Sequence, residues 1–224
     1  MPLIFCVLFL KKLNTKALKA FFIYAIILCF FSVGSLIALT VFKNRNVYIA
    51  LIRLFTTLEY LAIATILYYL VKNELFKKII LYSFIPFILY AIYDYFLLGK
   101  GQYNNYINLL SAFLLIIYII YFFYEKMKTV VMYPLYQSAS FWLCVGFFLY
   151  FTGTFFFFLF VKSSMDKKFI QQMNIIYGLV TVLKNILLCL SLFANENVEQ
   201  SDEELHIPSD LNLDEFSLTT QKNS

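Results

Sequence analysis

Six apolar stretches, each long enough to cross a bilayer as a helix, follow one another along this 224-residue chain. A spanning helix needs roughly 20 apolar residues, and in lipid only helices and closed barrels satisfy their own backbone hydrogen bonds. The connections between the stretches are short. We therefore predict an all-α membrane protein, a bundle of six to seven transmembrane helices over residues 1–195. The six clear spans cover residues 17–42, 48–72, 76–98, 104–124, 138–161 and 169–193.

The first ten residues decide between six helices and seven. Residues 1–10 are apolar, but as a helix they rise only about 15 Å, which is half a bilayer. They lack the basic start and the small-residue cleavage site of a signal peptide, and Lys11 and Lys12 follow them. Three interpretations stay open: a tilted partial span, an interfacial segment, or a first helix whose beginning has been lost to a misplaced start codon.

The charge of the chain falls into two opposed regions. Residues 1–195 contain 17 Lys and Arg against 5 Asp and Glu, whereas residues 196–224 contain 8 acidic residues and one Lys. A basic membrane region complements anionic headgroups, so the expected partner is the lipid bilayer and not nucleic acid. Residues 196–224 are expected to form a short, disordered acidic tail.

The lysines and arginines between the spans predict the orientation. Cytoplasmic loops carry an excess of positive charge. One side of the bundle collects nine cations and the other six, a bias that places the tail in the cytoplasm of a bacterial inner membrane. The nine are Lys11, Lys12, Lys16, Lys19, Lys72, Lys77, Lys78, Lys126 and Lys128, and the six are Lys43, Arg45, Lys100, Lys162, Lys167 and Lys168.

Four ionisable residues lie inside the spans, where charge is costly and commonly functional: Arg53, Glu59, Asp94 and Lys184. Arg53 and Asp94 lie at similar depths on neighbouring spans, so we expect them to pair near the outer interface. Glu59 and Lys184 differ in depth by four residues, about 6 Å of helical rise, which a lysine stem bridges. We expect this second pair near the middle of the membrane.

Two interpretations of these charges stay open. They are ion pairs that fix helix order and register, or Glu59 is a proton or ligand site. Nearby polar residues either line a pocket around it or satisfy hydrogen bonds between helices. These residues are Thr56, Thr57, Tyr60 and Asn185.

The chain lacks the residues of common membrane enzymes. His206, in the tail, is the single histidine, which excludes bis-histidine haem and HExxH zinc sites from the membrane region. Glu59 and Asp94 are expected to lie about 10 Å apart in depth, too far for a carboxylate dyad. The four cysteines lack metal-ligand spacing. We expect no catalytic residues, no metal and no cofactor.

Two further segments suggest contacts. Small and aromatic residues recur at three- and four-residue spacing in span 138–161, which predicts close packing of another helix, and the tail carries spaced apolar residues that could fold onto a cytoplasmic partner. A solvated tail without a partner, and a tail folded back on the cytoplasmic lysines, are the alternatives. The packing residues are Ala139, Trp142, Gly146, Tyr150 and Gly153, and the tail residues are Leu211, Leu213, Phe216 and Leu218.

Several short runs resemble a family of uncharacterised bacterial multi-pass membrane proteins of about this length. They are Leu58-Glu59-Tyr60, Phe141-Trp142, Gly146, Tyr150-Phe151, Gly153-Thr154-Phe155 and Lys184-Asn185-Ile186-Leu187. The resemblance covers residues 3–193 and stops before the acidic tail. The family carries a complete first helix where this chain has only residues 1–10, which favours the interpretation that the beginning of the first helix has been lost. Some of its members are neighbours of sensor kinases, but the resemblance implies no activity and no site residues.

The sequence thus favours a membrane-embedded sensory or regulatory protein that signals to a cytoplasmic partner. The main rival is a small transporter or proton-coupled carrier that uses Glu59 and Lys184, and a membrane enzyme is the third alternative. A transporter is expected to show inverted repeats and broken helices around its site. The sequence does not indicate the ligand, the partner or the oligomeric state.

Overall fold

A computed structural model describes residues 15–40, 45–97, 106–128, 138–160 and 167–194, and these residues form six long helices. The helices are α2 (Lys16–Thr40), α3 (Arg45–Leu70), α4 (Glu74–Leu97), α5 (Tyr106–Lys128), α6 (Ala139–Phe160) and α7 (Lys167–Phe193). All six are long and apolar enough to cross a membrane, which confirms the all-α, multi-pass prediction. The largest boundary error is at the end of α5, predicted at 124 and observed at Lys128. The predicted partial span 1–10 and the tail 196–224 lie outside the described residues.

Short polar side chains start three of the helices. Thr15, Asn73 and Ser138 each accept a hydrogen bond from a backbone N–H two or three residues further on. Such N-caps satisfy N–H groups that have no partner inside the helix. The helix starts are therefore fixed locally by the residues that the connections place there.

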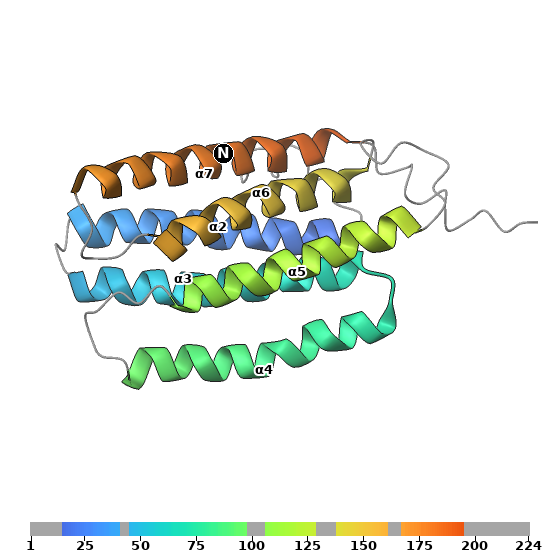
Figure 1. The fold of residues 1–224 in the computed structure, drawn as a ribbon, viewed down its shortest axis with the longest axis horizontal. Coiled ribbons are helices and arrows are strands. Elements are labelled where there is room, and N and C mark those ends of the chain that lie inside the picture. Colours follow the sequence, from blue (N-terminus) through green and yellow to red (C-terminus); the bar gives the residue numbers. More distant parts are fainter. Residues whose placement is uncertain (1–14, 41–44, 98–105, 129–137, 161–166, 195–224) are drawn as a thin grey trace, which may run out of the picture.

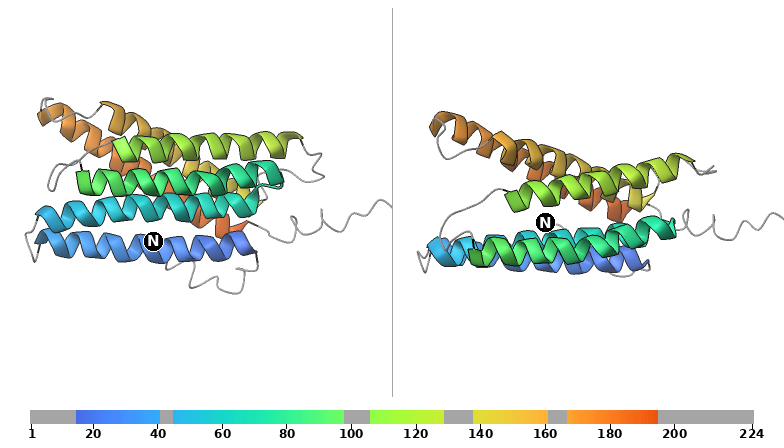
Figure 2. Two further views of the ribbon diagram at one scale, coloured as in Figure 1. Left: turned by 90° about the horizontal axis from the view of Figure 1, so that it is seen from below. Right: turned by 60° about the horizontal axis from the view of Figure 1, so that its bottom comes forward.

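The helices form two layers (Figure 2). One layer holds α2, α3 and α4, and the other holds α5, α6 and α7. The most extensive contacts are those of α2 with α3 and of α6 with α7, while α3 and α4 contact α5 across the layers. Helices that follow one another in the sequence run in opposite directions (Figure 1). The carboxyl ends of α2, α4 and α6 therefore lie at the same end of the bundle as the amino ends of α3, α5 and α7.

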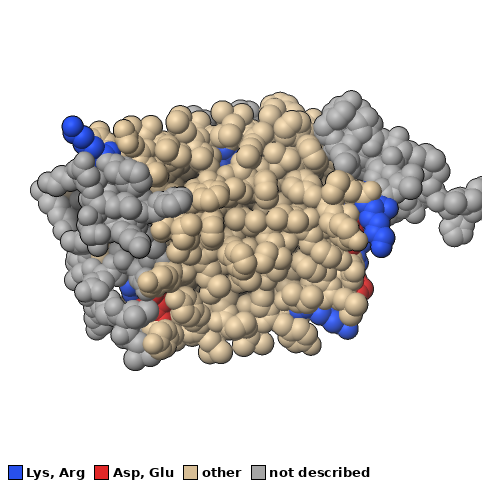
Figure 3. Space-filling view, in the orientation of Figure 1, with Lys and Arg blue, Asp and Glu red and all other residues tan. Residues whose placement is uncertain are grey.

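Large apolar side chains fill the space between the layers in one half of the bundle. They come from α3, α5, α6 and α7, and each is less than 2% exposed. They include Ile63, Leu67, Leu115, Ile119, Phe122, Phe147 and Leu188. The outer surface carries many exposed apolar side chains, and on the face drawn in Figure 3 most of the charged residues lie near the two ends, as expected for a helix bundle in a bilayer.

Helix α4 lies at the edge of the bundle and packs on α3 and α5. Phe87 stacks on Tyr60 of α3 with ring centroids 3.8 Å apart, and Phe76 stacks on Tyr121 of α5 at 3.6 Å. At the same end as Phe76, the Glu125 carboxylate of α5 accepts the backbone N–H groups of residues 72 and 73 at 2.9 and 2.8 Å. These contacts fix the connection between α3 and α4 against α5.

Candidate functional site: a central cavity

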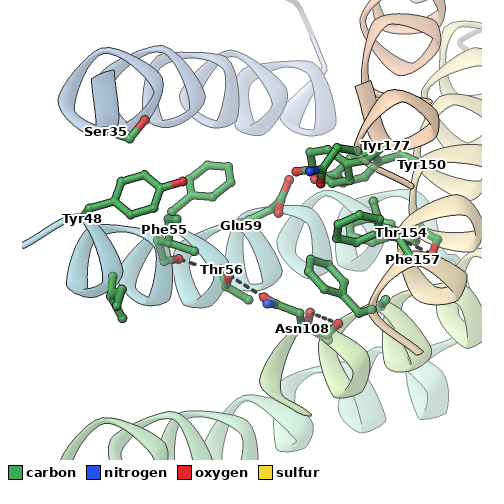
Figure 4. Close-up of a pocket in the computed structure, with 17 residues that line it drawn as sticks. Ser35, Tyr48, Phe55, Thr56, Glu59, Asn108, Tyr150, Thr154, Phe157 and Tyr177 are labelled. Atoms are coloured by element: carbon green, nitrogen blue, oxygen red, sulfur yellow. Dashed lines mark hydrogen bonds between the residues drawn. The ribbon is translucent and has the colours of Figure 1, made fainter. Parts of the chain in front are cut away.

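A cavity of about 780 Å³ occupies the other half of the space between the layers. Its walls come from the last turns of α2 and α6, the first half of α3, and the first turns of α5 and α7 (Figure 4). We call it the central cavity. Its lining residues are Ser35, Tyr48, Ile49, Ile52, Phe55, Thr56, Glu59, Asn108, Ser111, Ala112, Tyr150, Phe151, Thr154, Phe157, Phe158, Asn174 and Tyr177.

A buried ion pair lies at the inner end of the central cavity. Lys184 Nζ lies 3.7 Å from Glu59 Oε1, and the two side chains are 2% and 10% exposed. The Tyr24 hydroxyl accepts a hydrogen bond from Lys184 Nζ at 3.2 Å and donates one to Glu59 Oε1 at 3.1 Å. Lys184 Nζ also lies 3.6 Å from the centroid of the Tyr150 ring. The structure thus contains the pair that the sequence predicts, and joins α2, α3, α6 and α7 through it.

Hydrogen bonds order the wall formed by α3 and α5. Thr56 Oγ1 donates to Asn108 Oδ1 at 2.7 Å, and Ser111 Oγ donates to the backbone oxygen of Asn108 at 2.9 Å. All three residues are less than 9% exposed and line the cavity. A buried polar side chain that already has a partner costs little, so this wall offers oriented polar groups beside apolar ones.

The second predicted pair lies away from the central cavity. Arg53 Nε lies 3.5 Å from Asp94 Oδ2, and Arg53 Nη1 donates to the backbone oxygen of Asp94 at 3.4 Å. Both side chains are less than 10% exposed, and neither lines the cavity. This pair attaches α4 to α3, so its position supports the structural interpretation of these two charges.

The polar pocket expected around Glu59 is composed differently from the sequence prediction. Of the four polar residues proposed for it, Thr56 lines the central cavity and the other three do not. Tyr60 points toward α4, with its hydroxyl 2.8 Å from Ser83 Oγ. Thr57 donates to the Arg53 backbone oxygen, and Asn185 is partly exposed with a buried Oδ1 that has no hydrogen-bond partner among the residues that the structure describes. Helical rotation explains the difference, because residues adjacent in sequence point about 100° apart.

The predicted packing stripe of α6 faces α7 at its two glycines. A Cβ on Gly146 would lie 3.2 Å from Leu187 Cβ, and one on Gly153 would lie 2.9 Å from both Cγ atoms of Val180. Trp142 packs edge to face on Phe141, with centroids 5.7 Å apart. Tyr150 belongs to the ion-pair site. Ala139 is 2% exposed at the first position of α6.

Three residues of the site were not predicted from the sequence. Tyr24, Asn108 and Tyr177 belong to three helices, and Tyr24 is one of 18 tyrosines in an aromatic-rich chain. Asn108 carried a usable signal, because an amide inside a predicted span is costly unless it has a partner. The tail residues Leu211, Leu213, Phe216 and Leu218 lie outside the described residues, and their proposed contact stays a prediction.

Chemically, the central cavity is suited to binding. It combines one carboxylate, several hydroxyl and amide groups and many aromatic rings, which is the composition of a pocket for a small molecule. Comparisons with family models, with curated proteins and with solved structures give no match. The six long apolar helices support a multi-pass helical membrane protein, and the resemblance to a bacterial family stays a prediction.

Proposed function

We propose that the protein is a membrane-embedded receptor that binds a small molecule in the central cavity and signals to a cytoplasmic partner. The observation that carries the proposal is the cavity of about 780 Å³ with the Glu59–Lys184 pair at its inner end. Ligand sites in proteins occupy roughly 300–1,000 Å³ and combine apolar walls with a few oriented polar groups. In the predicted orientation the cavity lies toward the outer side of the membrane.

The form of the bundle favours a receptor over a transporter. Beyond the ion pair, the space between the layers is filled by apolar side chains such as Leu115, Phe122 and Phe147. The six described helices run without a break, even α4, which contains Pro86. Transporter sites are commonly formed by interrupted helices. A closed inner half suits a protein that converts ligand binding into a change of helix packing.

Filling the cavity tests the proposal. Ser111→Phe places a phenyl ring in the central cavity, whereas Ile117→Phe places one on the exposed face of the same helix, where Ile117 is 40% exposed. We expect a metabolite library to contain compounds that raise the melting temperature of the wild type and of Ile117→Phe but not of Ser111→Phe. A ligand at 100 times its Kd stabilises the folded state by about 2.7 kcal/mol, enough for detection.

The rival candidate, a proton-coupled carrier, is supported by the buried Glu59–Lys184 pair, since such pairs occur in proton relays. Transport of a bound compound across the membrane distinguishes a carrier from a receptor. If the protein is a receptor, proteoliposomes bind a compound found in the screen without accumulating it, with or without a proton gradient. Accumulation driven by the gradient would favour the carrier. Equal melting shifts in wild type and Ser111→Phe would contradict both functions at this cavity.

A further inference from the structure

The charge presented to the central cavity is negative. Among the described lining residues, Glu59 alone carries a formal charge. Its cationic partner Lys184 lies behind it, 2% exposed and outside the lining. Exposed cations near this end of the bundle, such as Lys168, act through water and are screened. An anionic ligand would therefore meet a carboxylate at the inner end of the cavity without direct access to a cation.

The walls are rich in aromatic rings. Aromatic faces attract cations, and a carboxylate among such rings is a common site for organic ammonium ions. The lining aromatic residues are Tyr48, Phe55, Tyr150, Phe151, Phe157, Phe158 and Tyr177.

The protein already holds one alkylammonium group in this environment. The ammonium of Lys184 lies 3.7 Å from Glu59 Oε1 and 3.6 Å from the centroid of the Tyr150 ring. Glu59 and Tyr150 also line the cavity, so a ligand approaches the same carboxylate and the same ring from the open side. The combination that binds Lys184 is thus available to an amine from outside.

We propose that the ligand of the central cavity is an organic amine, bound as its ammonium ion beside Glu59 with its apolar body against the aromatic walls. The inference rests on the proposed small-molecule-binding function and specifies its ligand class. The volume accommodates an arylalkyl amine with room for further substituents.

Charge balance adds a second consequence. A ligand ammonium beside Glu59 and Lys184 would leave one excess positive charge in a low-dielectric site, which is costly. Among the described residues, the titratable groups that face Lys184 are Tyr24, Glu59 and Tyr150, and Glu59 supplies the negative charge. The amine therefore replaces Lys184 on Glu59 while Lys184 gives up its proton to water. Binding of one amine releases one proton, so the affinity rises with pH while the free amine stays protonated.

Three probes with one phenylbutyl body test the ligand class: 4-phenylbutylamine, 4-phenylbutanol and 4-phenylbutyrate. Calorimetric titration of the full chain in lipid nanodiscs, corrected with empty nanodiscs, measures each affinity. We expect the amine to bind at least about tenfold tighter than the alcohol at pH 7, and the carboxylate more weakly than the alcohol. From pH 6 to pH 8 the amine's Kd should fall by up to about tenfold per pH unit, while that of the alcohol stays constant.

A double substitution tests whether Glu59 and Lys184 cause the preference for the amine over the alcohol. Glu59→Gln combined with Lys184→Met removes both charges and leaves neither one buried alone, so the bundle should fold. It should bind the amine and the alcohol within about twofold of each other. The matched control is Glu74→Gln with Lys77→Met, which removes an exposed pair at the opposite end of the bundle and should preserve the preference.

The source of the amine is found by changing the lipid. If nanodiscs that contain phosphatidylethanolamine weaken the binding of 4-phenylbutylamine at least about threefold relative to nanodiscs of equal anionic lipid content that contain a neutral glycolipid instead, the amine is a lipid headgroup; equal binding identifies a free amine. Equal or tighter binding of the alcohol by the wild type would overturn the amine, as would a preference that survives in Glu59→Gln/Lys184→Met. A further outcome is that the library compounds that stabilise the wild type and Ile117→Phe but not Ser111→Phe are neutral or anionic. That result would contradict the proposed ligand class and would still support the receptor function.

Discussion

At the scale of single residues, the buried pair Arg53–Asp94 makes the simplest prediction. Removing one partner leaves the other charge buried without compensation, which typically costs about 3 kcal/mol or more, whereas replacing both removes the problem. Arg53→Met and Asp94→Leu should therefore each lower the melting temperature in detergent more than the double substitution does. Glu74→Gln, in an exposed pair, should change it little. Additive effects of the two buried substitutions would contradict the pairing.

Tyr24 supplies a second test at this scale, because its hydroxyl bridges Lys184 and Glu59. Tyr24→Phe keeps the ring and removes the bridging hydroxyl, so the free energy of unfolding should fall by about 1–3 kcal/mol. Tyr82→Phe is the control, since Tyr82 is 67% exposed on α4 and should tolerate the change within about 0.5 kcal/mol. Equal melting temperatures for the two variants would mean that the bridge contributes nothing.

At the scale of helices, Gly153 controls the approach of α6 to α7. A Cβ at this position would lie 2.9 Å from both Cγ atoms of Val180, and a β-branched valine has little rotamer freedom to move away. Gly153→Ala should therefore destabilise the bundle by about 1–3 kcal/mol in thermal unfolding. Gly178→Ala on α7 meets nothing within 4 Å and should be neutral or stabilising. A neutral Gly153→Ala would contradict the close packing.

At the scale of the whole molecule, apolar length and loop composition were sufficient to predict the six helices, since each span satisfies its backbone internally. The pairs Arg53–Asp94 and Glu59–Lys184 were also predictable, because buried charges need partners and depth limits the choice. The central cavity was not. It depends on how two layers of helices separate at one end, and residues such as Asn108 and Tyr177 line it through rotations and crossing angles that spacing alone does not define.

The orientation of the chain in the membrane is the first prediction for the whole molecule. The excess of lysine on one side predicts that residues 196–224 lie in the cytoplasm. In a variant whose native cysteines are replaced by alanine, Ser201→Cys should resist a membrane-impermeant thiol reagent in intact cells and react after the membrane is opened. Ready labelling in intact cells would reverse the orientation of the bundle and of its cavity.

We infer that a cavity accessible to water and favouring cations lies inside the membrane-spanning bundle. The most direct test is the thiol reactivity of Ile52→Cys, which lines the cavity, compared with Leu54→Cys, which is 54% exposed on the outer face of the same helix at a similar depth. In the cysteine-free background, intact cells are treated with impermeant methanethiosulfonates that carry either a positive or a negative charge. We expect rapid labelling of Ile52→Cys, faster with the positive reagent, and no labelling of Leu54→Cys. An unreactive Ile52→Cys, or faster reaction with the negative reagent, would contradict this inference.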